Sequence, residues 1–451
     1  MEGCKRSKIG VVCNGFDTFE LKSVLTKNDA GDWGIAPDEN AVGVIRSTNF
    51  NNNGKLDLSD IAYRTLTPKK FSEKKLYASD ILIERSGGSE MQPVGRVGFI
   101  TDEMAKTDYA FANFIQRISI DDTVDAKFVY YCLQQMYEMG ITAGMQSQTT
   151  GIRNLDWKQY IKVYLPKPSL SEQTAIATLL SKVDEAIEAV QCIIAAAERL
   201  KKSLMQNLLT GKLKPDGTFR TPEEFYTDEK FGKVPLGWEV KRIDELFDFY
   251  PTASYSRSML SDNGDCKYIH YGDIHTRFDT FLDVSKEVLP YISRDKVKKF
   301  VFLKDGDIVI SDTSEDYEGV GKLVEITNIG ESKVISGLHT LLIRPKTNDV
   351  INGFKGYLFN EERVRLEFLK YVTGIKVYSI SKNSLAKVLL PIPPHDEQIW
   401  IKDKIDSIKK ELCNSVERIK CFKRLKKSLL QNLLTGKRNI SRTIIQFNNE
   451  E

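Results

Sequence analysis

The sequence predicts an α+β fold in which two mixed α/β domains are joined by two long helices forming an antiparallel coiled coil, with a pseudo-two-fold repeat. Three observations lead to this prediction: a segment that recurs at a constant offset, a heptad pattern in each copy, and two segments of similar size with mixed strand and helix signals. A chain of 451 residues is also too long for one ordinary core, so we expect two or more domains.

The repeat is the strongest of these signals. The register holds without a gap from Leu165 to Lys212, at an offset of 225 residues (390 − 165). Three pairs of motifs carry it: Leu-Pro-Lys-Pro at 165–168 with Leu-Pro-Ile-Pro at 390–393, Glu172-Gln173 with Glu397-Gln398, and the basic tract 199–212 with 424–437. A repeat this long and regular indicates a duplicated segment whose length is held constant.

Each copy is predicted to be one long helix, because its apolar residues alternate in steps of four and three. This seam comprises Ile176, Leu180, Val183, Ile187, Val190, Ile194, Ala197, Leu204 and Leu208 in the first copy, and Ile401, Ile405, Ile408, Leu412, Ile419, Phe422, Leu429 and Leu433 in the second. Lys201 interrupts the first seam, and Ser415 and Lys426 interrupt the second.

The ends of both helices carry recognisable signals. We expect Ser171 with Glu172 to cap the first helix, and Thr-Gly at 210–211 and 435–436 to end the two helices. A helix of about 40 residues is roughly 60 Å long. Two seams of matching length are expected to pack on each other. The alternative is two separate amphipathic helices, each lying on its own domain.

The two segments outside the helices share a skeleton of signals. A short apolar strand entered from an acidic turn is expected at 80–83 and at 307–310. Thr-Gly-Ile occurs at 150–152 and 373–375, before the strand that leads into each helix. The predicted segments are domain 1 (1–165), helix 1 (166–214), a linker (215–234), domain 2 (235–390), helix 2 (391–438) and a C-terminal tail (439–451).

Composition limits the class of protein. With 65 Lys and Arg against 62 Asp and Glu, the net charge is +3, so any nucleic-acid surface must arise from local clustering. No apolar run is long enough to cross a bilayer, and the N-terminus lacks the apolar segment of a signal peptide. The seven cysteines include no C-x-x-C pair, which argues against a disulfide framework or a zinc site. We expect a cytoplasmic protein without a membrane partner.

Motifs for catalysis are missing. The sequence has no phosphate loop of the G-x-x-x-x-G-K-[ST] type, no glycine-rich cofactor loop and no Asn-Pro-Pro-Tyr tetrad of amino-methyltransferases. We therefore expect no cofactor, neither ATP nor S-adenosylmethionine, and no catalytic residue. The histidines show neither metal spacing nor a nucleophile partner, so no metal site is expected: His270, His275, His339 and His395.

The motifs resemble those of the specificity subunit of type I restriction–modification enzymes. The resemblance rests on Val234-Pro-Leu-Gly-Trp-Glu239 and on the three repeated motif pairs, and it covers nearly the whole chain. It implies a non-catalytic subunit with two target-recognition domains, each reading one half of a split site in double-stranded DNA. It also implies that the helices fix the spacing and dock two methyltransferase subunits, and that motor–nuclease (restriction) subunits join the complex. The chain departs from the family pattern in one respect. Gly15-Phe16-Asp17 stands where a Pro-x-Gly-Trp opening is expected, which leaves the N-terminal boundary of the first target-recognition domain open.

Bases are read by polar side chains on loops that can enter a groove of DNA. Each domain has several polar loops, and each of them is otherwise explained as a solvated surface loop. We expect DNA contacts from Asn49, Asn51, Asn52, Arg85, Ser86, Gln146, Gln148, Thr149, Arg153, Tyr255, Arg257, Tyr271, His275, Ser311, Thr313, Lys376 and Tyr378. Two other classes stay open: a coiled-coil adaptor that does not touch DNA, for which these loops are unneeded, and a stand-alone nuclease–methyltransferase, against which the missing motifs argue.

Overall fold

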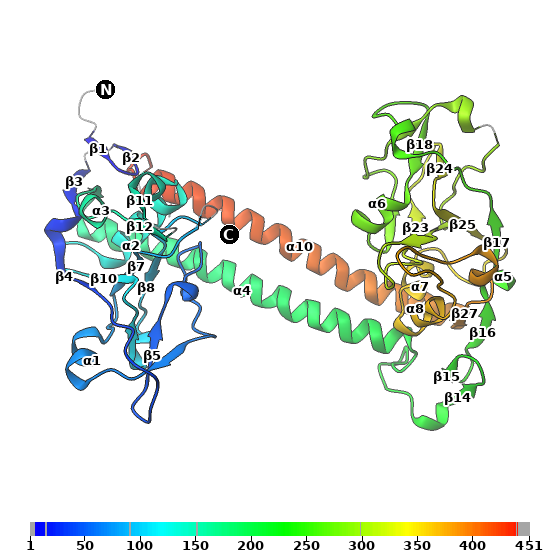
Figure 1. Ribbon diagram of the computed structural model, residues 1–451, viewed down its shortest axis with the longest axis horizontal. Helices are drawn as coiled ribbons and strands as arrows, with labels where there is room; N and C mark the ends of the chain where they lie inside the picture. Colours follow the sequence, from blue (N-terminus) through cyan, green and yellow to red (C-terminus); the bar gives the residue numbers. More distant parts are fainter. Residues whose placement is uncertain are drawn as a thin grey trace. The chain divides into compact units, whose positions relative to one another are not determined.

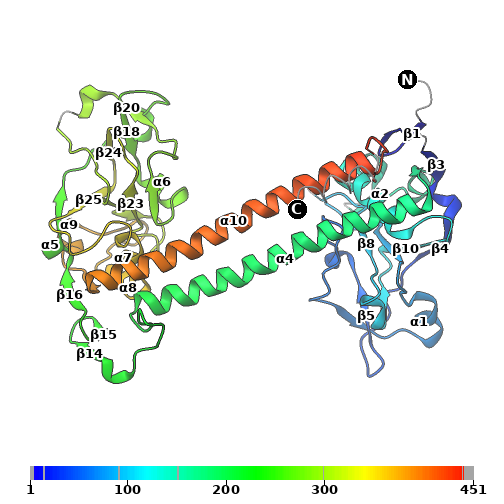
Figure 2. The same ribbon diagram turned by 180° about the vertical axis from the view of Figure 1, so that it is seen from behind.

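The structure is a computed structural model that describes residues 5–13, 16–89, 92–149, 152–297, 299–438 and 440. The chain forms two compact units. Unit 1 comprises Met1–Cys192 with Glu417–Glu451, and unit 2 comprises Ile193–Val416. Two continuous helices, α4 (Leu170–Leu209) and α10 (His395–Leu433), each contribute one part to unit 1 and the other part to unit 2 (Figures 1 and 2).

Unit 1 is built on a four-stranded antiparallel sheet in the order β4-β10-β7-β8, with α2 packed against it (Figure 1). A smaller three-stranded sheet has the order β6-β5-β9. The bounds in these two sheets are β4 (Leu25–Ala30), β5 (Val42–Ile45), β6 (Ala62–Arg64), β7 (Ile81–Glu84), β8 (Val97–Phe99), β9 (Tyr109–Phe111) and β10 (Ile115–Ile120). The strand predicted at 80–83 is therefore confirmed as β7, whose apolar run is fully buried.

The remaining elements of unit 1 are short. The paired strands are β1 (Lys5–Ser7) with β2 (Gly10–Val12), β3 (Asp17–Glu20) with β13 (Tyr164–Lys167), and β11 (Gln146–Thr149) with β12 (Ile152–Leu155). The α-helices are α1 (Pro68–Lys74), α2 (Ala126–Glu138) and α3 (Trp157–Tyr160), and the 3-10 turns are η1 (Leu21–Val24), η2 (Ser47–Asn49), η3 (Met104–Lys106) and η4 (Ile141–Met145).

Unit 2 repeats this plan. Its main sheet has the order β17-β25-β21-β23-β19, and the first four strands correspond in order to β4-β10-β7-β8. Its smaller sheet, β20-β18-β24, has the same mixture of one antiparallel and one parallel pairing as β6-β5-β9. The bounds are β17 (Phe247–Tyr250), β18 (Cys266–Ile269), β19 (Phe281–Asp283), β20 (Tyr291–Ile292), β21 (Ile308–Ser311), β23 (Leu323–Thr327), β24 (Val334–Ser336) and β25 (Thr340–Pro345).

Short pairs and helices complete unit 2. The pairs are β14 (Phe225–Asp228) with β15 (Gly232–Pro235), β16 (Glu239–Arg242) with β27 (Leu389–Ile392), and β22 (Thr313–Ser314) with β26 (Tyr378–Ser379). The helices are α5 (Ile243–Leu246), α6 (Tyr271–Thr276), α7 (Lys355–Phe359), α8 (Glu362–Leu369) and α9 (Lys382–Leu385), with 3-10 turns η5 (Pro222–Glu224), η6 (Arg257–Met259) and η7 (Arg294–Val297). The predicted α+β repeat is thus confirmed within the chain.

The two long helices pack on each other in antiparallel fashion inside each unit. In unit 1, Ile176, Leu180 and Ile187 of α4 share a core with Leu429 and Leu433 of α10. In unit 2 the opposite ends meet, because the segment around Leu208 of α4 shares a core with the segment from Ile401 to Ile405 of α10. The predicted seam pairing is confirmed, and the helices are 40 and 39 residues long.

One seam interruption is a buried ion pair. Lys426 of α10 lies 2.7 Å from Asp184 of α4 and is nearly buried. The Tyr131 hydroxyl, on α2, donates to the other Asp184 oxygen at 2.9 Å, and burial raises the pKa of Tyr131, so it remains a donor. Lys426 is therefore not a free surface cation. Its ion pair with Asp184 links α10 to α4, and Asp184 in turn links both helices to α2 through Tyr131.

The corresponding place in unit 2 has different chemistry. Lys409 stands at the position of Asp184 (409 − 184 = 225). Its ammonium lies 4.5 Å from the centre of the Tyr357 ring and 5.1 Å from that of Phe281. Burial lowers the pKa of Lys409, and the charge of Lys201 adds to the shift. Both units therefore hold a polar junction in the seam, made of unlike groups.

The N-terminus of α4 differs from the prediction in its cap. Ser169, not Ser171, is the capping residue, because its hydroxyl accepts from the Glu172 amide at 3.4 Å. Glu172 returns the interaction by accepting from the Ser169 amide at 3.1 Å, which completes a capping box. Ser171 lies one residue inside the helix, where its hydroxyl cannot reach that amide.

The glutamines of the repeated Glu-Gln motif tie each helix to its domain. The Gln173 side chain accepts from the Asp125 amide, just before α2, at 2.9 Å and donates to the Pro168 carbonyl at 2.9 Å. Gln398 does the same in unit 2, where it accepts from the Ile351 amide at 3.0 Å. The motif therefore has a structural role in both copies.

Each long helix ends beside the segment at which one of the domains begins. Gly211 and Gly436 end α4 and α10 at φ +67°, as expected for glycine caps. A Cβ on Gly211 would come within 2.9 Å of the Trp238 ring, and a Cβ on Gly436 within 3.1 Å of the Phe16 ring. Phe16 therefore occupies in unit 1 the place that Trp238 occupies in unit 2, so the aromatic ring, rather than the full Pro-x-Gly-Trp opening, is the shared feature.

Two segments are predicted to lie outside the domains and the helices: a linker and a C-terminal tail. Residues 215–234, predicted as a linker, include most of the β14–β15 hairpin, and Val234 is fully buried in the core of unit 2. The predicted tail, 439–451, lies outside the described residues except for Ile440. Of the helices in the described ranges, none combines the length and the apolar character that crossing a bilayer demands.

Candidate nucleic-acid interface

In unit 1, three of the predicted polar loops meet at the end of β7. The Ser86 hydroxyl donates to the Asn154 side chain at 2.6 Å, and the Gly87 amide donates to the Arg153 carbonyl at 3.1 Å. These contacts join the loop after β7 to the β11–β12 hairpin. The Ser47 hydroxyl donates to the Ser86 carbonyl at 3.5 Å, which brings in the loop that follows β5.

A buried ion pair fixes this junction. Arg96 binds Glu84 through two nitrogens at 2.8 and 2.7 Å, and both side chains are almost completely buried. The same guanidinium donates to the Ser47 carbonyl at 2.9 Å and to the Phe50 carbonyl. Arg96 therefore positions the loop after β5 against the end of β7. This role was not predicted from the sequence, because a single arginine in a Gly-rich connector carries no distinguishing pattern.

The Asn-rich loop of unit 1 divides into structural and exposed residues. Asn49 is buried: its side chain accepts from the Arg46 amide at 2.9 Å and donates to the Asp57 carbonyl at 2.8 Å. These hydrogen bonds hold the turn and leave the Asn49 side chain little surface for a DNA contact, so that contact stays a prediction. Asn51 and Asn52 are exposed on the same loop.

The other predicted residues of unit 1 lie directly after β7 or on the β11–β12 hairpin. Arg85 is half-buried and donates to Gln116 at 3.1 Å, and Gln146 donates to the Thr142 carbonyl at 3.3 Å. Arg153 is half-buried, and its side chain has no partner within the described part of the chain. Gln148 and Thr149 belong to β11, but their side chains are outside the described residues.

Unit 2 assembles the corresponding segments. The His275 Nε2 atom, at the end of α6, lies 2.8 Å from the Ser311 hydroxyl and 3.0 Å from the Thr313 carbonyl, at the end of β21. Thr313 pairs with Ser379, which joins the end of β21 to the hairpin at 373–379. The loop after the first strand of the small sheet, the end of the central strand and the hairpin thus converge in both units.

Three of the four histidines gather around Tyr271. The ring of Tyr271 lies 4.6 Å from that of His270, 6.2 Å from that of His275 and 5.3 Å from that of His339. Burial lowers the pKa of His270, and the charge of Arg257 adds to the shift. His270 Nδ1 accepts from the Gly272 amide at 3.2 Å, which agrees with a neutral ring. His270 and His339 were missed, since isolated histidines in a sequence do not reveal that they share a surface.

Several predicted residues of unit 2 have internal partners. Ser311 is completely buried between His275 and the Thr313 carbonyl, and its DNA contact stays a prediction. The Tyr255 hydroxyl donates to the Lys296 carbonyl at 2.9 Å. Arg257 is largely exposed and donates to the buried Asp273 at 2.8 Å.

The remaining predicted residues of unit 2 lie on or beside the hairpin. Lys376 is exposed, and Tyr378 is half-buried with its ring edge-on to that of Tyr317, 5.5 Å between centroids. Thr313 is half-buried and donates to Asp312 at 2.7 Å. The loop that follows β21 is acidic, with Glu315, Asp316 and Glu318 exposed. Acidic side chains repel phosphates but can accept from the amino group of cytosine.

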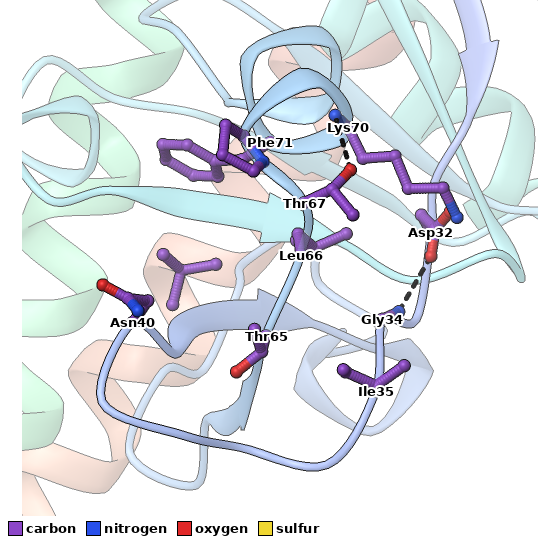
Figure 3. A pocket seen from close by; sticks show the side chains of 11 residues that line it. Asp32, Gly34, Ile35, Asn40, Thr65, Leu66, Thr67, Lys70 and Phe71 are labelled. Atoms are coloured by element: carbon purple, nitrogen blue, oxygen red, sulfur yellow. Dashed lines mark hydrogen bonds and ion pairs between the residues drawn. The ribbon is translucent and has the colours of Figure 1, made fainter.

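A pocket elsewhere in unit 1 is separate from this interface. It has a volume of about 570 Å³ and lies between the end of β4 and the start of α1 (Figure 3). Lys70 and Asp32 form an ion pair of 2.5 Å at its rim, and Ile35, Leu66 and Phe71 supply apolar walls. None of the 17 residues predicted to contact DNA lines it. Within the described ranges, no group of three or more His, Cys, Asp or Glu side chains is arranged to hold a metal ion.

The two-domain arrangement of the chain matches a known protein family. Residues 14–199 and 235–420 each match the family model described as the type I restriction modification DNA specificity domain. The chain is 24% identical to the type I restriction enzyme MjaVIII specificity subunit of Methanocaldococcus jannaschii, over 82% of this chain and 81% of that protein. It is 21% identical to the putative MjaX specificity subunit of the same organism, over 97% and 96% of the two chains.

Solved structures share the fold. The crystal structure of the S subunit of the type I restriction–modification system from M. genitalium aligns with a TM-score of 0.52 at 14% identity, covering 93% of this chain and 96% of that chain. The two matched domains and the paired helices define a protein that carries two DNA specificity domains in one chain. The chain belongs to the type I restriction–modification DNA specificity family. It is a type I restriction–modification specificity subunit.

Proposed function

We propose that each unit reads one half of a bipartite site in double-stranded DNA through the interface described above. The observation that carries this proposal is the convergence, in both units, of the same three segments at the end of the central strand. Two copies of one surface suit two half-sites. Asn51, Asn52, Arg153, Arg257 and Lys376 are the predicted residues best placed for it, since they are exposed or lack a full set of internal partners.

We further propose that α4 and α10 fix the spacing of the half-sites and dock two methyltransferase subunits, and that restriction subunits join through that complex. The nearly equal lengths of the helices, 40 and 39 residues, support a spacing role. Methyl transfer and cleavage are assigned to the partners, because the sequence carries no motif for either reaction.

Exchange of one domain tests the proposal. Replacing residues 14–165 by the corresponding segment of another family member should change one half of the methylated motif and leave the other half intact. Methylome sequencing of cells that express the chimera with its methyltransferase subunits measures the outcome. The matched exchange of 235–390 should change the opposite half. A change in both halves from a single exchange would contradict the modular reading, and methyl transfer by the chain alone would contradict its non-catalytic role.

Arg153 is expected to contribute to affinity. Its backbone carbonyl accepts from the Gly87 amide at the junction of the three loops, and its side chain has no partner within the described part of unit 1. Arg153→Ala should weaken binding of the methyltransferase complex to DNA, and a phosphate contact would lower the slope of log K against log salt by about 1. A salt titration measures this slope. Lys158→Ala, an exposed cation on α3, is the matched control and should leave the slope unchanged.

A further inference from the structure

Both units present an exposed isoleucine at the same position of their hairpins. Ile152 and Ile375 each follow a Thr-Gly pair, and their exposed fractions are 46% and 91%. Val377, on the same hairpin as Ile375, is 54% exposed. A single exposed apolar side chain is common on proteins. An exposed isoleucine at the same place in two domains whose loops otherwise differ suggests that both isoleucines contact the same kind of partner.

The hairpin of unit 2 is closed by the chain itself. Thr373 and Ser379 exchange two backbone hydrogen bonds of 2.9 and 2.8 Å. Gly374 has φ +128°, and a Cβ there would come within 2.1 Å of the Val377 carbonyl oxygen, so only glycine fits this close approach. The loop therefore has a defined shape, and it holds Ile375 and Val377 in solvent.

The surroundings of the hairpin indicate what covers it. The Ile380 amide donates to the Asp312 carbonyl at 2.9 Å, which places the hairpin beside the cluster of His275 and Thr313. Lys376 lies between the two apolar residues and is exposed. A partner that covers this loop would therefore place a negatively charged or hydrogen-bond-accepting group beside Lys376, and an apolar group of about methyl size beside Ile375 or Val377.

The major groove of DNA meets both requirements. It offers phosphate and guanine acceptors to a lysine, and each thymine presents a C5-methyl group there. The major groove is about 12 Å wide and admits a two-stranded ribbon, whereas the minor groove is about 6 Å wide. A paired hairpin with apolar residues at its end fits the former.

We propose that Ile375 contacts a thymine methyl group in the major groove and so helps to specify the half-site read by unit 2, and that Ile152 has the same role in unit 1. This inference rests on the proposed function. It adds apolar residues to a reading surface otherwise made of polar ones.

The test uses the complex of this chain with its methyltransferase subunits and a duplex bearing the methylated motif. Each thymine of the unit 2 half-site is replaced in turn by deoxyuridine, which removes only the methyl group. At one position the wild-type complex should methylate about fourfold more slowly at subsaturating DNA, which is the effect of one methyl-sized contact. Ile375→Ala should show a loss of that size on the thymine duplex and no further loss on the deoxyuridine duplex.

Matched controls separate the outcomes. Leu236→Ala removes a side chain of unit 2 that is 56% exposed and outside the interface, and it should behave as wild type on both duplexes. The inference is overturned if no position of this half-site responds to deoxyuridine, if the half-site contains no A·T pair, or if Ile375→Ala loses activity equally on both duplexes. A wild-type complex that recognises no bipartite motif would instead contradict the proposed function.

Discussion

Lengthening both long helices by four residues should lengthen the spacer of the methylated motif by one or two base pairs. Four residues add about 6 Å to a helix and rotate its distal part by roughly 40°. B-DNA advances about 3.4 Å per base pair. We expect insertions after Ala196 of α4 and after Asn414 of α10 to lie opposite each other, because continuing the antiparallel register of the Asp184–Lys426 pair along the helices joins these positions (184 + 426 = 196 + 414).

The paired insertion keeps the contacts at both ends of the helices. Four residues act as a heptad stutter, so the seam is expected to continue with local unwinding. Methylome sequencing of the variant gives the spacer directly. Four residues inserted after Asp216, in an exposed turn, are the control and should leave the spacer unchanged. An active complex with long helices and the original spacer would show that the helices do not set the distance.

Lys426→Ala is expected to destabilise unit 1 by about 2 kcal/mol. The substitution leaves the Asp184 carboxylate with Tyr131 but without its cation. Breaking a fully buried ion pair costs about 3–5 kcal/mol. The value is lower here because the side chains of Lys426 and Asp184 keep 10% and 16% of their exposure.

Hydrogen exchange of the full-length chain measures this effect locally. Protection of α2, which carries Tyr131, should fall about 30-fold, while the main sheet of unit 2 should keep its protection. Lys427→Ala is the matched control, because Lys427 is the neighbouring exposed lysine. Adding Asp184→Asn to Lys426→Ala should restore part of the loss. Equal loss in Lys427→Ala would show that charge alone, rather than the buried pair, is responsible.

The fold was predictable from the sequence because its signals are periodic. A heptad seam in two copies of fixed offset defines paired helices irrespective of loop details. The cap of α4 was misplaced by two residues, since Ser169 and Ser171 are both suitable and only the geometry of the Glu172 amide separates them. Lys426 was interpreted as an interruption of the seam because its partner, Asp184, is on the other copy.

The candidate interface was predictable only as a set of loops. Polar residues mark where the chain turns, but a sequence does not show which hydrogen-bonding groups the turn consumes. The side chains of Asn49 and Ser311 form hydrogen bonds within their own loops and are buried, whereas Asn51 and Lys376 stay exposed. Arg96 and His339 depend on contacts with residues distant in the chain, so no local pattern identified them.

The contribution of α10 to unit 1 has a consequence for synthesis on the ribosome. Domains generally fold in the order in which they are translated. Here the core of unit 1 includes Leu429, Leu430 and Leu433, close to the last described residues, whereas unit 2 is complete at Val416. The unit that is translated second therefore has all of its residues first. Until α10 emerges, the core that includes Ile176 and Leu180 lacks its α10 residues, so we expect the pairing of the helices to complete the folding of unit 1 late.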